Sequence, residues 1–340
     1  MANTTKNLIK NRSELVFLYD IKDANPNGDP MDENKPRIDE ETEINLVTDV
    51  RLKRTIRDYL KNFKRKDIFV KRVVKESGEL KTKEEFIAEE KITDKNDERR
   101  LTEKYIDLRL FGATIALKGG RRNNVRKNSE DTIADEENDK SGAIVWIGPV
   151  QFRFGRSLHR VEPRTVKGTS VMPSKSGKEQ GTFIETQILP YSLISFYGII
   201  NENAAKETNL TSEDELLLLD GMWNGTKNLI TRSKIGQMPR FLLRVIYKEN
   251  NYHIGDLDKK IKMIKNDLKQ DDKAIRDISE FKLDLSNLIN VLKENKEFIE
   301  TIEFKADSSA VFILNDQEKT GAKVMDLLKL VDVSVRQIVF

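Results

Sequence analysis

Five apolar residues in succession, Leu15–Tyr19, lead directly into a polar loop, Asp20–Pro30. An uninterrupted apolar run of this length is typical of a strand that is buried on both faces. The loop contains three turn-forming dipeptides, Asn25-Pro26, Asn27-Gly28 and Asp29-Pro30, which restrict its backbone. We therefore expect a buried strand that ends in a preorganised loop, and such loops commonly position side chains for binding.

The loop also matches the first half of a calcium-binding EF-hand, because Asp23, Asn25 and Asn27 have the required spacing. The twelfth position, which holds a bidentate glutamate in an EF-hand, is Asn34, and a strand rather than a helix precedes the loop. A plain surface turn is a further alternative. Carboxylates here could also assist metal-dependent phosphodiester cleavage, although aspartates in turns more often bond to the backbone; they are Asp20, Asp23, Asp29 and Asp32.

The composition limits the classes of function. The 60 Lys and Arg residues are nearly balanced by 57 Asp and Glu residues, so a polyanion would have to be bound by local clusters of cations. The absence of cysteine excludes disulfides, thiolate metal sites and cysteine nucleophiles. The polar N-terminus and the lack of any run of about 18 apolar residues predict a cytoplasmic protein without a membrane span. We expect no cofactor and no metal.

Residues 48–63 are predicted to form an amphipathic helix. Leu52, Ile56 and Leu60 recur at helical spacing, and Thr48 precedes them as a suitable N-cap. The opposite face is basic and carries Arg51, Lys53, Arg54, Arg57 and Lys61. Such a face either binds a polyanion or is simply solvated.

Residues 153–178 form a long basic segment that also contains three glycines. Glu162 is its one acidic residue, against the cations Arg153, Arg156, Arg160, Arg164, Lys167, Lys175 and Lys178. A long basic excursion between two strands suits an arm that reaches over a phosphate backbone, with Val171 and Met172 as an apolar tip against bases. A solvated hairpin is the alternative.

Apolar patterns predict the other elements of the first 250 residues. Strands are expected at 105–113, 143–154, 182–200 and 241–247, and a second core helix at 213–230. Gly236 and Pro239 end that helix and leave Arg232 and Lys234 beside the last strand.

The order strand, helix, strand, strand, helix, strand within residues 15–247 is the split βαβ, ferredoxin-like pattern of RNA-recognition modules. We therefore predict an α+β fold with an RRM-like core made of residues 1–63 and 141–250. Insertions are expected at 64–140 and at 155–181. Residues 251–340 are predicted to form a C-terminal extension, helical by periodicity at 256–295 with a break near Asp271-Asp272, and followed by strands and a short helix.

Several motifs between Leu15 and Tyr247 resemble the Cas7 family of the RAMP superfamily, the backbone subunits of type I CRISPR effector complexes, with the I-B-like branch as the nearest match. They are Asp23–Pro30 with Arg37-Ile38-Asp39, Val47–Arg54, Asp107–Ala113, Gly148–Phe152, Leu189–Leu193 and Thr231–Gln237. Beyond residue 250 the resemblance is weak.

The resemblance implies a noncatalytic protein, copies of which assemble head to tail along a CRISPR RNA together with other Cascade subunits. It implies an RRM-like palm, fingers at 64–140 and a thumb at 155–181 with its tip at Val171 and Met172. The guide would stay free to pair with target DNA. The implied RNA contacts are Asn25, Arg51, Arg54, Arg156, Arg160, Arg164, Lys167, Arg232 and Lys234. Because type III relatives cleave target RNA with an aspartate in a palm loop, a metal-dependent endonuclease using Asp23 or Asp29 is the alternative.

Overall fold

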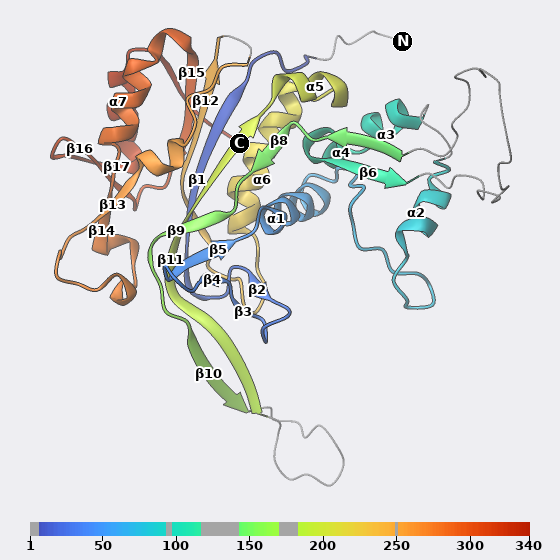
Figure 1. The fold of residues 1–340 in the computed structure, drawn as a ribbon, viewed down its shortest axis with the longest axis horizontal. Coiled ribbons are helices and arrows are strands. Elements are labelled where there is room, and N and C mark those ends of the chain that lie inside the picture. Colours follow the sequence, from blue (N-terminus) through green and yellow to red (C-terminus); the bar gives the residue numbers. More distant parts are fainter. Residues whose placement is uncertain (1–6, 93–96, 117–142, 170–182, 249–250) are drawn as a thin grey trace, which may run out of the picture.

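The computed structural model describes residues 7–92, 97–116, 143–169, 183–248 and 251–340. The predicted α+β class is confirmed, because helices lie beside a large mixed sheet (Figure 1). In spatial order, the main path of this sheet consists of β18 (Ser334–Gln337), β15 (Ile299–Ala306), β12 (Met238–Tyr247), β1 (Ser13–Ala24), β11 (Phe183–Ile200), β9 (Gly155–Arg160), β5 (Ile44–Val47) and β4 (Ile38–Asp39). β8 (Val150–Phe152) and β10 (Arg164–Thr169) also pair with β11.

β1 is central to the sheet, and its burial follows from its apolar run. It pairs antiparallel with β11 on one side and with β12 on the other. Leu15 and Phe17 pack into one apolar cluster, whereas Val16 and Leu18 pack into a second cluster. All four are fully buried, which confirms the prediction of a strand covered on both faces. Burial of each such side chain stabilises the fold by about 1.5–3 kcal/mol.

Four adjacent strands, β12-β1-β11-β9, form an antiparallel core. α1 (Asp49–Asn62) follows β1 in the chain, and α6 (Ser212–Lys227) follows β11. Apart from short added elements, this order is the split βαβ arrangement. The second core strand is β9 and not the predicted 143–154, because Gly155–Arg160 alternates buried and exposed residues and pairs with both β11 and β5.

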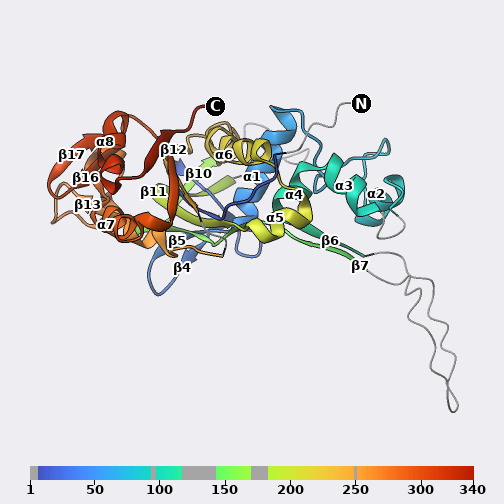
Figure 2. The same cartoon turned by 90° about the horizontal axis from the view of Figure 1, so that it is seen from above.

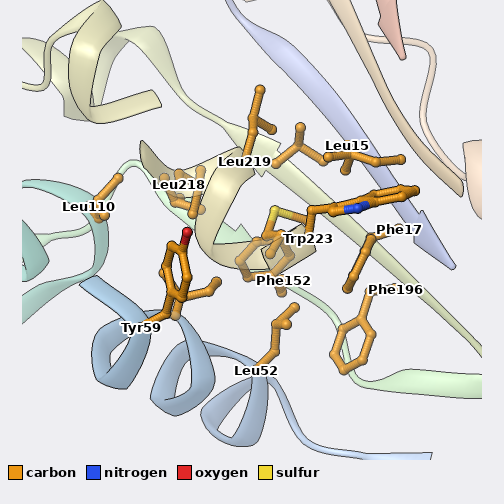
Figure 3. Close-up of a cluster of buried hydrophobic side chains, with 14 of the residues drawn as sticks. Leu15, Phe17, Leu52, Tyr59, Leu110, Phe152, Phe196, Leu218, Leu219 and Trp223 are labelled. Carbon is orange, nitrogen blue, oxygen red and sulfur yellow. The ribbon is translucent and has the colours of Figure 1, made fainter. Parts of the chain in front are cut away.

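α1 and α6 pack against each other and against β1 (Figure 3). The predicted start of α1 is confirmed, since the Thr48 side chain accepts a hydrogen bond from the Arg51 amide. The helices approach closely at Gly221, where an added Cβ would lie 2.9 Å from Ile56 Cγ2. Leu52 and Trp223 fill the apolar space between the helices and the sheet.

A smaller unit, here called the α2–β7 unit, lies beside the main sheet, on the side away from the C-terminal region (Figure 2). It contains α2 (Lys83–Glu89), α3 (Glu98–Lys104), α4 (Ile106–Phe111), and β6 (Gly112–Ala116) paired with β7 (Ala143–Ile147). Phe69, Leu101, Tyr105 and Trp146 belong to a separate apolar core. This unit thus has an apolar core of its own, while α4 also contributes Ile106, Leu110 and Phe111 to the core of the main sheet.

Two sequence predictions for the α2–β7 unit are wrong. Residues 106–111 are helical and not extended. The two polar residues of this segment, which in a strand would face solvent, are instead bonded to other parts of the fold. Asp107 accepts a hydrogen bond from the Phe69 amide at 2.7 Å, and Arg109 forms an ion pair with Asp214 at 2.8 Å. Residues 143–147, expected in the core, pair with β6 instead of with the main sheet.

β10 and the first part of β11 form a hairpin arm that projects from the sheet (Figure 1). Arg164 pairs with Ile188 at its base, and Thr169 pairs with Phe183 at its outer end. Because β9 is part of the main sheet, the projecting part begins at 164 and not at 155. The expected tip, Val171 and Met172, lies outside the described residues.

The C-terminal region covers the face of the main sheet opposite α1 and α6. It contains the four-stranded sheet β13 (Lys262–Lys265), β14 (Phe281–Asp284), β16 (Val311–Leu314) and β17 (Gln317–Thr320), with α7 (Ser286–Glu294) and α8 (Val324–Leu328). Phe281 and Phe312 pack in the same cluster as Val16 and Leu18. β15 and β18, from this region, extend the main sheet.

The helix predicted over 256–295 is wrong except for α7. Much of this segment consists of turns and the short 3-10 helices η2 (Leu257–Lys260), η3 (Asp272–Ala274) and η4 (Ile278–Glu280). Asp271 and Asp277 accept hydrogen bonds from the amides of Lys273 and Ser279. Such bonds from aspartate to the nearby backbone compete with helix formation, so the leucine spacing alone was misleading.

The remaining elements are short. β2 (Gly28–Asp29) pairs with β3 (Lys35–Pro36) in the loop that follows β1. α5 (Glu202–Thr208), which the sequence did not predict, precedes α6, and η5 (Lys296–Phe298), η6 (Gly321–Lys323) and η7 (Lys329–Val331) connect the C-terminal elements. Over the described ranges, no helix combines the length and the apolar character needed to cross a membrane.

Candidate nucleic-acid interface

Three of the sequence motifs meet at one end of the main sheet. The main-chain N–H of Asn25, in the loop after β1, donates to Ser233 O at 2.8 Å. Lys234 Nζ donates to the main-chain carbonyl of Asn25 at 3.1 Å. Thr48 Oγ1, at the start of α1, donates to Asn27 Oδ1 at 3.1 Å. The fold therefore brings the loop, the first turn of α1 and the segment before β12 together. We call Asn25, Arg51 and Lys234 the loop site.

The loop site holds positive charge without a carboxylate partner. Among the described residues, neither Arg51 nor Lys234 forms an ion pair; Arg51 donates to Thr55 Oγ1 at 3.0 Å. Both side chains are half-buried. Burial lowers the pKa of Lys234, and the nearby Arg51 cation lowers it further. Burial also lowers the pKa of Arg51. Two half-buried cations without a counter-ion are suited to an anionic ligand.

Buried polar atoms without a hydrogen-bond partner also gather in these segments. They are Asn25 Oδ1, Arg37 Nε, Arg51 Nε and Gln237 Nε2. Nearly all buried polar atoms in folded proteins are paired, and an exception points to a missing ligand, water or ion. Arg37 and Gln237 were not among the predicted contacts, although both lie in motifs that carried the family resemblance.

The face of the sheet that RNA-recognition modules use for stacking bases is closed in this chain. Such modules present aromatic side chains on the open face of a four-stranded sheet. Here Tyr197 and Phe241 are buried under the C-terminal region together with Phe281 and Phe312. Any nucleic acid would thus contact the loops and edges of the core instead of this face.

Four predicted contacts lie along β9 and the arm, at the same end of the molecule as β2, β3 and β4 (Figure 1). Arg156 forms a 3.4 Å ion pair with Asp39, and Lys167 forms a 3.2 Å ion pair with Glu185. Arg164 has no ion pair within the described residues. Because exposed ion pairs of this kind contribute about 0–1 kcal/mol, these cations can readily turn to phosphate groups.

Arg160 differs from the other cations of this row because acidic residues surround it. Its guanidinium lies 3.6 Å from Glu43, 3.5 Å from Asp271 and 3.8 Å from Asp272. The two aspartates belong to the C-terminal region, around the start of η3. In this structure the Asp271–Asp272 turn therefore holds the cation that the sequence assigned to RNA.

Two further predicted contacts are exposed. Arg54 forms a 2.7 Å ion pair with Asp58 one turn along α1. Arg232 lies in the turn next to Lys234 and has no ion pair in the described part of the chain. Arg232 is two residues from Lys234 in the sequence and therefore lies close to the loop site. The Arg54 side chain is instead bound to Asp58 of the same helix.

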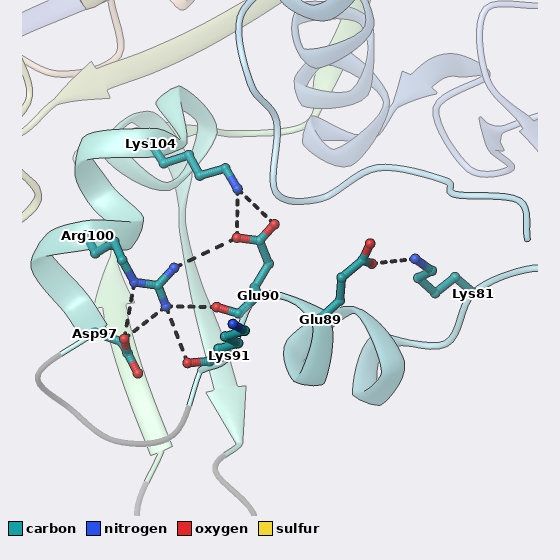
Figure 4. Close-up of polar contacts among 7 residues, drawn as sticks. All are labelled: Lys81, Glu89, Glu90, Lys91, Asp97, Arg100 and Lys104. Carbon is teal, nitrogen blue, oxygen red and sulfur yellow. Dashed lines mark hydrogen bonds and ion pairs between the residues drawn. The ribbon is translucent and has the colours of Figure 1, made fainter.

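Three cations of the α2–β7 unit are held by carboxylates of the same unit (Figure 4). Lys104 lies 2.8 Å from Glu90, and Arg100 lies 2.9 Å from Asp97. Lys81 forms an ion pair with Glu89. These three cations differ in this respect from Arg51 and Lys234, which form no ion pair among the described residues.

The aspartates of the alternative endonuclease do not gather into a metal site. Asp29 accepts a hydrogen bond from the Met31 amide at 3.0 Å and forms an ion pair with Arg37 at 2.8 Å. Asp23 is exposed, with a positive φ of 48°. Across the described residues, no three His, Cys, Asp or Glu side chains are grouped so that they could hold a metal ion. Asp29 thus stabilises its own turn.

Comparisons with known proteins identify the family. The family model described as CRISPR-associated protein Cas7 matches residues 11–286. A CRISPR-associated protein Cas7 of Haloferax volcanii is 33% identical over 324 residues, which cover 90% of each chain. A chain of a solved CRISPR RNA-guided surveillance complex aligns over 97% of this chain and 95% of its own, with 11% identity and a TM-score of 0.49. A chain of a pre-nicking surveillance complex aligns over 94% and 100%, with 11% identity and a TM-score of 0.48. By its sequence, this chain belongs to the Cas7 family.

Proposed function

We propose that this chain is a backbone subunit of a type I CRISPR effector complex that binds CRISPR RNA through its sugar-phosphate backbone. One observation carries the proposal: among the described residues, the half-buried cations Arg51 and Lys234 influence each other and have no carboxylate partner, and Lys234 bonds to Asn25, whose amide oxygen is unpaired. Phosphate is the anion that such a site suits. Family membership supports the same function.

The path of the RNA runs from the loop site to the arm. Arg232 lies next to Lys234, while Arg156, Arg164 and Lys167 line β9 and the arm at the same end of the molecule. In this proposal the palm is the split βαβ core, the α2–β7 unit corresponds to the fingers, and the arm corresponds to the thumb. Because the C-terminal region closes the stacking face, the protein holds the backbone and the bases remain free to pair with target DNA.

In this proposal several copies of the chain assemble on one guide RNA. One subunit contacts a short stretch of RNA, so copies of the chain bind in succession and contact each other head to tail. Other subunits of the complex close the two ends of this row. We propose that the chain has no catalytic role, which is supported by the engagement of Asp29 with Arg37 and the backbone.

Measurement of RNA affinity with matched variants tests the function. Arg51→Ala and Lys234→Met should each lower the affinity for single-stranded RNA about 10- to 100-fold, the usual effect of a lost hydrogen bond to a charged group. Lys206→Met is the control, because Lys206 is an exposed cation on α5 without an ion pair among the described residues. Equal affinities for all three variants and the wild type would refute an RNA site here.

Incubation of the RNA-loaded protein with complementary RNA and Mg²⁺ tests the noncatalytic proposal. We expect no cleavage by the wild type. Cleavage that disappears in Asp23→Ala or Asp29→Ala would instead establish the endonuclease function. If both variants still bound RNA, the loss of cleavage would be due to a lost catalytic group and not to weaker RNA binding.

A further inference from the structure

We propose that Asn25 recognises the ribose 2′-hydroxyl beside the phosphate held by Arg51 and Lys234, and thereby makes the loop site selective for RNA over DNA. This inference rests on the proposed function and adds to it the group that distinguishes the two nucleic acids. It starts from the unpaired amide oxygen of Asn25.

The orientation of the Asn25 amide is fixed by its neighbour. Its Nδ2 group donates to Asn34 O at 2.7 Å. A main-chain carbonyl can only accept a hydrogen bond, so the nitrogen must face Asn34 and the oxygen must point away from it. Asn25 is 1% exposed, and its Oδ1 has no hydrogen-bond partner among the described residues. The structure thus presents a fixed, buried acceptor that lacks a donor.

Phosphate cannot satisfy this acceptor, because phosphate oxygens themselves accept hydrogen bonds. In this structure neither cation of the site donates to Asn25 Oδ1: Lys234 donates to the main-chain carbonyl of Asn25, and Arg51 donates to Thr55. A donor that arrives together with the phosphate would satisfy this acceptor and leave the two cations to the phosphate. In RNA the 2′-hydroxyl is a donor directly next to the 3′-phosphate, and DNA lacks it.

The contact between Lys234 and Asn25 also brings a bound phosphate to this loop. Lys234 Nζ rests on the Asn25 carbonyl, and both Lys234 and Arg51 are cations whose burial disfavours their charged forms. A phosphate at the surface attracts both side chains outward. The ribose next to that phosphate then lies beside Asn25, whose carbonyl Lys234 contacts in this structure.

The test compares RNA and DNA of the same sequence and length by fluorescence anisotropy. Wild-type protein should bind RNA more tightly than DNA. In Asn25→Leu, which has nearly the same shape without the acceptor, RNA affinity should fall about 10-fold while DNA affinity stays within about 2-fold, since only one hydrogen bond to the sugar is lost. Arg51→Ala should weaken both nucleic acids equally, because both contain the phosphate.

Wild-type protein alone supplies the second measurement, which does not depend on the folding of a variant. A series of RNAs, each carrying a single 2′-O-methyl group, removes the donor at one position at a time. We expect affinity to fall at specific positions and to stay unchanged at the others. Equal binding of RNA and DNA by the wild type, an equal loss of both in Asn25→Leu, or no sensitive position would each overturn this inference while leaving RNA binding intact. Failure of the wild type to bind RNA would instead refute the proposed function.

Discussion

Lys234 donates a 3.1 Å hydrogen bond to the main-chain carbonyl of Asn25, a residue 209 positions earlier in the sequence. This contact brings the segment before β12 onto the loop that follows β1. It also places a half-buried ammonium next to Arg51 instead of next to a carboxylate. Burial of two cations without a carboxylate partner lowers the stability of the folded state, and the same arrangement suits the binding of an anion.

Replacement of Lys234 should separate stability from binding. Because burial and Arg51 disfavour the charged form of Lys234, Lys234→Met should leave the free energy of unfolding unchanged or raise it, while RNA affinity falls. Urea denaturation and fluorescence anisotropy on the same preparation measure the two effects. A loss of stability above about 1 kcal/mol would show instead that the hydrogen bond to Asn25 O outweighs the cost of burying the charge.

The lowered pKa of Lys234 also predicts a dependence on pH. Between this lowered pKa and the ordinary value of 10.5, the unfolded chain binds a proton that the folded chain has released. The free energy of unfolding of the wild type should therefore rise with pH in this window relative to Lys234→Met. RNA affinity should fall over the same window, because the ammonium that pairs with phosphate is lost. Parallel pH profiles for the two proteins would contradict this assignment.

The Asp271–Asp272 turn should compete with RNA for Arg160. Both aspartates lie within 4 Å of its guanidinium. The double variant Asp271→Asn with Asp272→Asn removes this attraction and keeps an acceptor for the Lys273 amide, so we expect RNA affinity to rise several-fold at low salt. Asp326→Asn combined with Glu207→Gln, at exposed positions on α8 and α5, removes the same two charges and is the control for the change in net charge. Unchanged affinity would place Arg160 outside the RNA path.

How far the sequence could predict the fold depended on the range of the interactions. The buried strand at Leu15 and the helix starting at Thr48 were correct, because an apolar run and an N-cap are local signals. The second core strand was misplaced, since 143–147 and Gly155–Arg160 look equally extended and only pairing with distant strands distinguishes them. The helix over 256–295 failed because aspartate turns interrupt an otherwise helical spacing.

The candidate site was predictable only in part for the same reason. Asn25, Arg51 and Lys234 were named from motifs, but their contact depends on tertiary structure. The carboxylates around Arg160 come from a segment that had been predicted as helix. The unpaired Gln237 amide gave no signal beyond its place in a motif, because burial without a partner cannot be read from residue type.

Glu14 should be essential to the stability of the fold. Its buried carboxylate accepts hydrogen bonds from the hydroxyls of Tyr197 and Tyr247 and from the amides of Ile254 and Gly255. Glu14→Leu leaves these four donors without an acceptor, so the free energy of unfolding should fall by about 3 kcal/mol or more. Thermal and urea unfolding measure this loss. A loss below about 1 kcal/mol would mean that water replaces the carboxylate.

The arm should contribute to the salt dependence of RNA binding. Each contact between a cation and a phosphate of a single strand changes the slope of log K against log salt concentration by about 0.7. Arg164→Ala combined with Lys167→Ala removes two exposed cations of β10, so the slope should become shallower by about 1.4. Lys248→Ala with Lys206→Ala removes the same charge away from the arm and should leave the slope unchanged. RNA affinity measured over a range of salt concentrations for both double variants tests this prediction. Equal slopes for the two variants would show that the arm does not contact phosphate.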